Sequence, residues 1–186
     1  ATLVAGGAET MSMINMGGWR MVPNPDMAIK NPKWFLSMGL TSEMVAEEYK
    51  ITRKDQDNFA LASVEKAIHA IDSGKFREEI VPITVKENYF EDGKNKTREL
   101  VFDTDEGPRR ETTLEGLSKL KPAFSSNGVS TAGNSSQMSD GAAFVLVVSE
   151  KILKRYNLQP MARLVDYQVA GVEPYKMGIG PVKAIP

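Results

Sequence analysis

The chain's most distinctive stretch is residues 128–143, GVSTAGNSSQMSDGAA, and it leads directly into the apolar residues 144–148, FVLVV. Almost every residue of the stretch is small or carries a hydroxyl or amide group. Small side chains let a ligand approach the backbone closely, and hydroxyls and amides supply directional hydrogen bonds. On composition alone, a polar turn before a strand explains the stretch equally well. Neither G-x-G-x-x-G nor the phosphate-loop pattern occurs, so those mechanisms do not indicate nucleotide binding.

Apolar strands flank a long insertion. The wholly apolar residues 144–148 predict a strand that is buried on both faces. Residues 2–5 predict another short buried strand that ends at Gly6 and Gly7, and residues 162–169 predict a third. Strands alternating with helices indicate an α/β core, with residues 11–137 inserted between buried strands.

Helix signals dominate the first half of the insertion. Thr41 opens a short helix that runs through Tyr49, and Thr52 and Asp55 form a capping box for the next helix. Gly74 is placed to end that second helix. The helix has an apolar face whose members recur at helical spacing: Phe59, Ala62, Ala67, Ala70 and Ile71.

A hairpin is predicted to follow. Residues 80–85 form its first strand, at an edge because Pro82 has no N–H to donate. The turn at residues 91–94 leads to a second strand around residues 100–102. A short helix is then predicted from Thr113 to about Leu120.

The composition excludes several classes of site. The 186 residues contain no Cys and one His, so they provide no disulfide, cysteine-ligated metal site, thiolate nucleophile or His-rich metal site. We interpret His69 as an ordinary helix residue. A net charge of −1 gives no electrostatic basis for a nucleic-acid partner. The longest apolar run, residues 142–148, is far shorter than the ~20 residues of a membrane span, so we expect a soluble protein.

The motif Thr131-Ala132-Gly133-Asn134-Ser135-Ser136, followed by Asp140-Gly141-Ala142-Ala143, resembles a thiolase. The likeness covers the whole chain. Further matching segments follow in order: residues 4–12, residues 38–43 with 53–57, residues 113–117 with 119–124, and residues 177–181. Several independent motifs in sequence order are much more specific than one.

The resemblance implies an α/β fold: the layered α-β-α-β-α core of thiolases, incomplete in this chain, with an inserted α+β loop domain that covers coenzyme A. Residues 1–11 would end the N-terminal half, and residues 12–138 would form the loop domain. Residues 139–158 would be the last strand and helix of that half, and residues 159–186 would begin the C-terminal half. A homodimer or homotetramer is implied for the full-length protein.

The implied activity is that of an acyl-CoA C-acyltransferase. Such an enzyme cleaves 3-ketoacyl-CoA with CoA into acetyl-CoA and a shortened acyl-CoA, or runs the reverse Claisen condensation. Acyl-CoA and CoA are its substrates, and no cofactor is implied. Residues 134–137, with Ser37 and Gly116 where the biosynthetic type has His and Ser, favour the degradative type over the acetoacetyl-CoA type.

No catalytic residue of the family falls within this sequence. The family uses a nucleophilic Cys, a second Cys that moves the substrate proton and His-containing oxyanion holes. We expect these groups upstream of Ala1 and downstream of Pro186, and we expect residues 1–186 alone to be inactive.

Coenzyme recognition is what the resemblance carries over to this chain. Ser136 aligns with the family serine that hydrogen-bonds pantetheine, and Ala132 and Gly133 would form the wall beside it. Arg109 aligns with a basic residue near the adenine and phosphates, although the neighbouring Arg110 leaves the register open by one. The remaining predicted contacts are apolar: Leu117, Ala123, Phe124 and Met138 along the channel, and Met38 and Met177 at the acyl end.

Other readings stay open at this point. A non-catalytic CoA- or lipid-binding protein of thiolase ancestry has the same motifs, and an interaction surface is a third possibility. Seven of the ten methionines fall within residues 11–44, which fits either an irregular core or an adaptable apolar wall. We expect exposed apolar sheet surface and self-association. The expected compartment is the cytoplasm, with the mitochondrion and peroxisome as alternatives.

Overall fold

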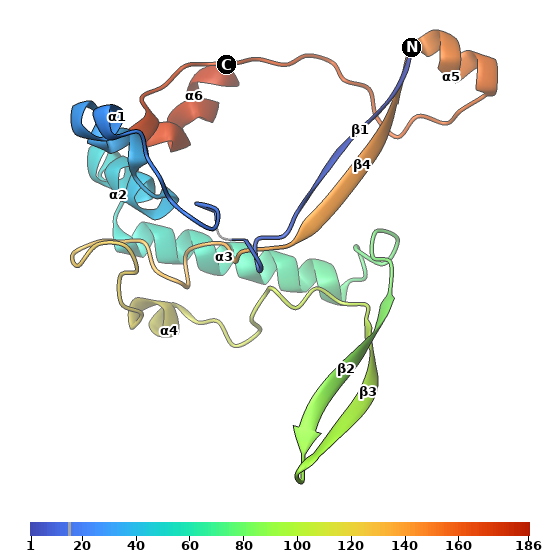
Figure 1. The fold of residues 1–186 in the computed structure, drawn as a ribbon, viewed down its shortest axis with the longest axis horizontal. Helices are drawn as coiled ribbons and strands as arrows, with labels where there is room; N and C mark the ends of the chain where they lie inside the picture. Colours follow the sequence, from blue (N-terminus) through green and yellow to red (C-terminus); the bar gives the residue numbers. More distant parts are fainter. Residues whose placement is uncertain (15) are drawn as a thin grey trace. The chain divides into compact units, whose positions relative to one another are not determined.

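The computed structural model describes residues 1–14 and 16–186 (Figure 1). Its backbone divides into two compact units. Unit 1 consists of Ala1–Tyr49 with Ser136–Pro186, and unit 2 consists of Lys50–Ser135. Unit 1 is therefore assembled from both ends of the chain, whereas unit 2 is one continuous segment.

A two-stranded antiparallel ribbon is the main element of unit 1. Strand β1 (Thr2–Glu9) pairs with β4 (Gly141–Val148) over its whole length, from Thr2 opposite Val148 to Glu9 opposite Gly141. Gly6 permits the close approach of the two strands, because a Cβ at this position would collide with the Phe144 ring and the Ala143 carbonyl. Segments far apart in the sequence thus become neighbours, as the predicted insertion between strands requires.

The ribbon does not have the burial that its composition predicts. Phe144 is 66% exposed, and Val145, Leu146 and Val147 are exposed as well. The prediction of a strand buried on both faces is therefore wrong for this chain, because β4 has one strand partner and neither face is buried in the described structure. The apolar sheet surface is exposed, as expected.

The helices of unit 1 are short except for one. They are α1 (Pro25–Lys30), η1 (Pro32–Phe35), α2 (Met38–Tyr49), α5 (Glu150–Tyr156), η2 (Pro174–Ile179) and α6 (Gly180–Ala184). Helix α2 begins at Met38, earlier than Thr41, and the Ser37 hydroxyl accepts a hydrogen bond from the Leu40 amide at 3.4 Å. Helix α2 packs against η2.

The predicted strand at residues 162–169 is absent from the described structure. This segment is irregular, and Leu164 in it is 83% exposed. Apolar side chains gave the segment a strand-like pattern, but a strand forms only when another strand pairs with it. No strand of the described chain does so.

Unit 2 is built around the long helix α3 (Arg53–Asp72). The Thr52 hydroxyl accepts from the Asp55 amide at 3.2 Å, and the Asp55 carboxylate accepts from the Thr52 amide at 2.9 Å, so the predicted capping box is confirmed. Gly74, with φ +71°, follows the end of the helix as predicted. The predicted apolar face is only partly confirmed: Phe59 is exposed, and the buried residue of α3 is Asp57.

The predicted hairpin of unit 2 is confirmed, with a later start. Strand β2 (Ile83–Glu91) pairs with β3 (Lys94–Phe102). The connecting residues Asp92 and Gly93 both have positive φ, 54° and 74°, as a type I′ hairpin turn requires. The ladder begins after Pro82, which cannot donate to it, so the prediction that residues 80–82 belong to the strand is wrong. Helix α4 (Leu114–Ser118) follows.

Candidate functional site

The loop at residues 129–134 is held by the side chain of Asn134. The Asn134 Oδ1 accepts from the Thr131 amide at 2.7 Å, and its Nδ2 donates to the Val129 carbonyl at 3.0 Å. The Thr131 hydroxyl in turn accepts from the amides of Gly133 and Asn134 at 3.2 and 3.3 Å. Short polar side chains that bond to nearby backbone groups favour such turns over regular structure. The polar composition of this stretch therefore produces a tightly bonded loop.

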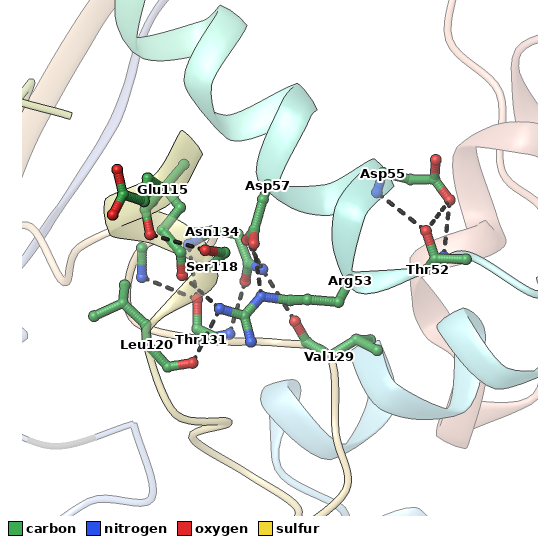
Figure 2. A network of polar contacts seen from close by, with 12 residues as sticks. Thr52, Arg53, Asp55, Asp57, Glu115, Ser118, Leu120, Val129, Thr131 and Asn134 are labelled. Atoms are coloured by element: carbon green, nitrogen blue, oxygen red, sulfur yellow. Dashed lines mark hydrogen bonds and ion pairs between the residues drawn. The ribbon is translucent and has the colours of Figure 1, made fainter. Parts of the chain in front are cut away.

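A partly buried ion pair on α3 lies against this loop. Arg53 Nε and Asp57 Oδ2 are 2.8 Å apart, and the two residues face each other because they are four apart on one helix. The Asp57 side chain is 2% exposed. Its second oxygen, Oδ1, accepts from Asn134 Nδ2 at 3.0 Å (Figure 2). The carboxylate is thus satisfied from the helix on one side and from the loop on the other.

Arg53 also joins α3 to the segment that contains α4. Its Nη2 donates to the Leu117 carbonyl at 2.6 Å and to the Leu120 carbonyl at 3.0 Å. The Leu117 carbonyl, near the end of α4, also accepts from the Leu120 amide at 3.0 Å, so Arg53 adds a second donor there. Figure 2 shows Arg53 extending from α3 toward Leu120, with Asn134 and Thr131 beside Asp57. A single network therefore fixes helix, loop and α4 within unit 2.

Apolar packing supports the same arrangement. Leu117 is 5% exposed, and the Thr113 hydroxyl caps its helix by accepting from the Gly116 amide at 3.0 Å. A Cβ built at Gly133 would lie 2.5 Å from Leu117 Cδ2 and equally close to Leu120 Cδ1. Only glycine fits here without displacing those side chains.

The predicted contacts in unit 2 fall into a buried set and an exposed set. Leu117 is buried and Gly133 is half-buried. Ala132 is exposed although Thr131 before it is fully buried. The Ala123 amide donates to the Ser130 carbonyl at 2.9 Å, which ties the segment of Ala123 and the exposed Phe124 to the loop. Four predicted contacts therefore lie on segments joined by packing and backbone hydrogen bonds: Leu117, Ala123, Ala132 and Gly133.

Arg109 and Arg110 differ in what they contact. Arg110 donates through Nη1 and Nη2 to the Asp72 carboxylate at 3.0 and 2.7 Å. This hydrogen-bonded pairing raises the pKa of Arg110 and lowers the pKa of Asp72. Arg109 is exposed, and its guanidinium forms no ion pair with any residue that the structure describes. Of these two arginines, Arg109 is thus the one that no described carboxylate engages.

Four predicted contacts lie in unit 1. Ser136 and Met138 are exposed in the segment before β4. Met38 begins α2, and Met177 lies on η2, which packs against α2. An ion pair joins these two elements, with Lys176 Nζ 2.9 Å from a Glu48 oxygen, and it raises the pKa of Lys176. The two methionines are therefore carried by elements that contact each other.

Sequence reasoning missed the residues that organise the loop. In the sequence, Arg53, Asp57 and Asn134 stand only within longer matching segments, with no site role of their own. The signal for Arg53 and Asp57 was their spacing of four on a predicted helix. Nothing local linked them to Asn134, which is 77 residues from Asp57 in the sequence.

Other features of unit 2 stand apart from this site. A hollow of about 480 Å³ at the end of α3 is lined by Ile71, Gly74, Phe76, Arg77, Ile80, Pro82, Asp103, Thr104 and Asp105, none of them a predicted contact. His69 is exposed on α3.

Among residues 1–14 and 16–186, no group of three or more His, Asp or Glu side chains is placed to hold a metal. The helices in the same ranges include none with the length and hydrophobicity of a membrane span.

Comparison with known proteins identifies the family. Residues 1–151 match the family model described as the N-terminal domain of thiolase. The chain belongs to the thiolase family. The predicted thiolase fold is confirmed by solved structures. The chain aligns with the dimeric peroxisomal thiolase of Saccharomyces cerevisiae at a TM-score of 0.82 and 39% identity, over 100% of this chain and 46% of that one.

Proteins similar in sequence to this chain also support its placement in the thiolase family. The chain is 47% identical to a 3-ketoacyl-CoA thiolase of Bacillus subtilis, over 100% of this chain and 48% of that protein. It is 45% identical to an acetyl-CoA acetyltransferase of Pseudomonas aeruginosa, over 98% of this chain and 48% of that protein. It is 44% identical to the human peroxisomal 3-ketoacyl-CoA thiolase, over 98% of this chain and 43% of that protein. The chain thus spans about half the length of these relatives.

Proposed function

We propose that residues 1–186 are the coenzyme-covering portion of an acyl-CoA C-acyltransferase. The complete enzyme cleaves 3-ketoacyl-CoA with CoA to give acetyl-CoA and a shortened acyl-CoA, or runs the reverse condensation. The observation that carries this proposal is the loop at residues 129–134. Asn134 and Thr131 hydrogen-bond to backbone groups of this loop, and Ala132 is left exposed. A loop fixed in this way offers a pantetheine chain a surface that needs little reordering on binding.

Each predicted contact is assigned to one part of the coenzyme or its acyl group. The exposed Ser136 hydroxyl hydrogen-bonds the pantetheine, with Ala132 and Gly133 as the close wall beside it. Arg109 supplies positive charge to the phosphates, since Arg110 is engaged by Asp72. Leu117, Ala123, Phe124 and Met138 line the channel. Met38 and Met177 provide an adaptable apolar surface for the acyl chain.

The acyl-transfer step needs a group that these residues do not contain. A thiolate carries the acyl group as a thioester in this chemistry, and the 186 residues hold no Cys. We assign the nucleophile and the oxyanion donors to parts of the protein beyond residues 1–186. CoA is a substrate, and no resident cofactor or metal enters the proposal.

Assembly and organisation are part of the same proposal. Residues 12–138 act as the loop domain, with residues 50–135 as its compact part, and the flanking residues 1–11 and 139–158 belong to the N-terminal half. Residues 159–186 begin the C-terminal half. The complete protein forms a homodimer or homotetramer in the cytoplasm. The dimeric yeast thiolase supports self-association through its similarity to this chain.

A thiolysis assay with protein from the complete reading frame tests the proposal. With acetoacetyl-CoA and a longer 3-ketoacyl-CoA as substrates, we expect CoA-dependent cleavage, faster for the longer substrate. Arg109→Ala and Ser136→Ala should raise the KM for CoA, whereas Arg110→Ala, the matched control, should leave it unchanged. CoA binding without turnover would indicate a non-catalytic binding protein, and absence of CoA binding would refute the proposal.

A further inference from the structure

We infer that Asp57, together with Arg53, is a positioning residue for the coenzyme-binding loop. The inference rests on the proposed function and adds residues to it that do not themselves contact the coenzyme. Asp57 is the most deeply buried charged side chain among the residues that the structure describes, at 2% exposure. Burial of a carboxylate is costly unless it is paired and hydrogen-bonded, so a residue of this kind requires an explanation.

The contacts of Asp57 explain its burial. Oδ2 binds Arg53 Nε at 2.8 Å, and Oδ1 binds Asn134 Nδ2 at 3.0 Å. With Asn134 Nδ2 drawn toward Asp57 and the Val129 carbonyl, Asn134 Oδ1 is directed to the Thr131 amide. Asp57 therefore fixes which way the Asn134 amide points, and that orientation closes the loop.

Arg53 extends this control to the other wall of the site. Its Nη2 holds the carbonyls of Leu117 and Leu120, whose side chains lie against Gly133. The Arg53–Asp57 pair thus sets the loop and the α4 segment with respect to each other. A shift of the pair displaces Ala132 and Gly133 relative to Leu117, although neither charged residue is among the predicted coenzyme contacts.

Two substitutions separate this positioning role from simple stabilisation. Asp57→Asn keeps the shape but presents an N–H₂ group to one of two donors, Arg53 Nε or Asn134 Nδ2. Asn134→Ala leaves the Arg53–Asp57 pair intact and removes its link to the loop, together with the bonds of Asn134 to Thr131 and Val129. Asp55→Asn is the matched control, because Asp55 lies on the same helix and caps it without contacting the loop network.

The experiment measures KM for CoA, kcat and amide hydrogen exchange in protein from the complete reading frame. Both Asp57→Asn and Asn134→Ala should raise KM for CoA about tenfold, as loss of well-placed binding groups does, with kcat within about threefold of wild type. Exchange at the Gly133 and Asn134 amides should accelerate in both. Asp55→Asn should leave KM for CoA and exchange in the loop unchanged.

The outcomes are distinct. An unchanged KM for CoA in Asn134→Ala overturns the positioning role, and so does a rise in the KM for CoA of Asp55→Asn that equals the rise in the other variants. In either case, CoA binding by the wild-type protein leaves the proposed function standing. If Asp57→Asn does not fold, an unchanged KM for CoA in Asn134→Ala still overturns the positioning role. Wild-type protein that neither binds nor uses CoA contradicts the proposed function and with it the inference.

Discussion

The carboxylate of Asp57 and the side-chain amide of Asn134 are joined by a 3.0 Å hydrogen bond across 77 residues of sequence. Both groups are otherwise fully engaged, Asp57 by Arg53 and Asn134 by the backbone of its own loop. In a buried network of this kind, removing one member leaves the others without partners. The stability of unit 2 and the shape of the candidate site therefore depend on the same few atoms.

Truncating Asp57 should strongly destabilise unit 2. Asp57→Ala leaves the Arg53 guanidinium, itself only 23% exposed, without its counter-charge. Breaking a buried pair by removing one partner costs about 3–5 kcal/mol. Urea unfolding followed by circular dichroism measures the loss. A cost below about 1 kcal/mol, the level of an exposed pair, would show that the network contributes little to stability.

The capping box of α3 should contribute less than the ion pair. Thr52→Ala removes the hydroxyl that accepts from the Asp55 amide at 3.2 Å. Loss of such a cap costs about 1 kcal/mol. The same unfolding experiment gives the value, and Thr52→Ser, which keeps the hydroxyl, is the matched control. Equal losses in the two variants would contradict the role of the hydroxyl.

Gly133 should not tolerate a side chain. In Gly133→Ala the new Cβ meets Leu117 Cδ2 and Leu120 Cδ1 at 2.5 Å, so those side chains must move. Overpacking of this kind costs about 1–3 kcal/mol. Adding Leu120→Ala should relieve part of the cost, giving a coupling of at least about 0.5 kcal/mol in a double-mutant cycle. Strict additivity would indicate that Gly133 and Leu120 do not interact.

Asp140 should make unit 1 sensitive to acid. Its carboxylate accepts from the Ser12 hydroxyl at 2.5 Å and from the Ser12 amide at 2.8 Å, and these bonds, the hydroxyl first, lower the pKa of Asp140 below its ordinary value of 3.8. Because the folded-state pKa is the lower one, the stabilisation is complete above the ordinary pKa and is lost as the pH falls through the folded-state value.

The measurement compares wild type with Asp140→Asn across a pH series. The wild type should be the more stable at neutral pH, and its advantage should shrink below about pH 4, where an ordinary Asp begins to protonate. An advantage that stays constant down to pH 2 would contradict the assignment to Asp140.

The sequence was most informative where signals were local. The capping box at Thr52 and Asp55, the stop at Gly74 and the turn at Asp92 and Gly93 depend on residues close together in the chain, and the structure confirms each. The wrong predictions concerned burial and pairing. Residues 162–169 have a strand-like pattern without a strand partner, and residues 144–148 are apolar yet exposed.

The candidate site likewise combines local features that the sequence indicates with long-range contacts that it does not. The resemblance of the motif around Ala132 and Gly133 to thiolases led to the prediction that this region binds the coenzyme. It did not indicate what holds that region in place. The contacts of Arg53 with Leu117 and of Asp57 with Asn134 span 64 and 77 residues, and no local pattern encodes them. Folding brings these groups together through tertiary packing.

Amide hydrogen exchange with and without coenzyme A tests the central claim most directly, in protein from the complete reading frame. Peptides that cover residues 129–136 and the segment containing Arg109 should become protected when CoA is added, while the β2–β3 hairpin should exchange at an unchanged rate. Protection confined to other parts of the chain, or no protection at saturating CoA, would contradict the assignment of the coenzyme site to this loop.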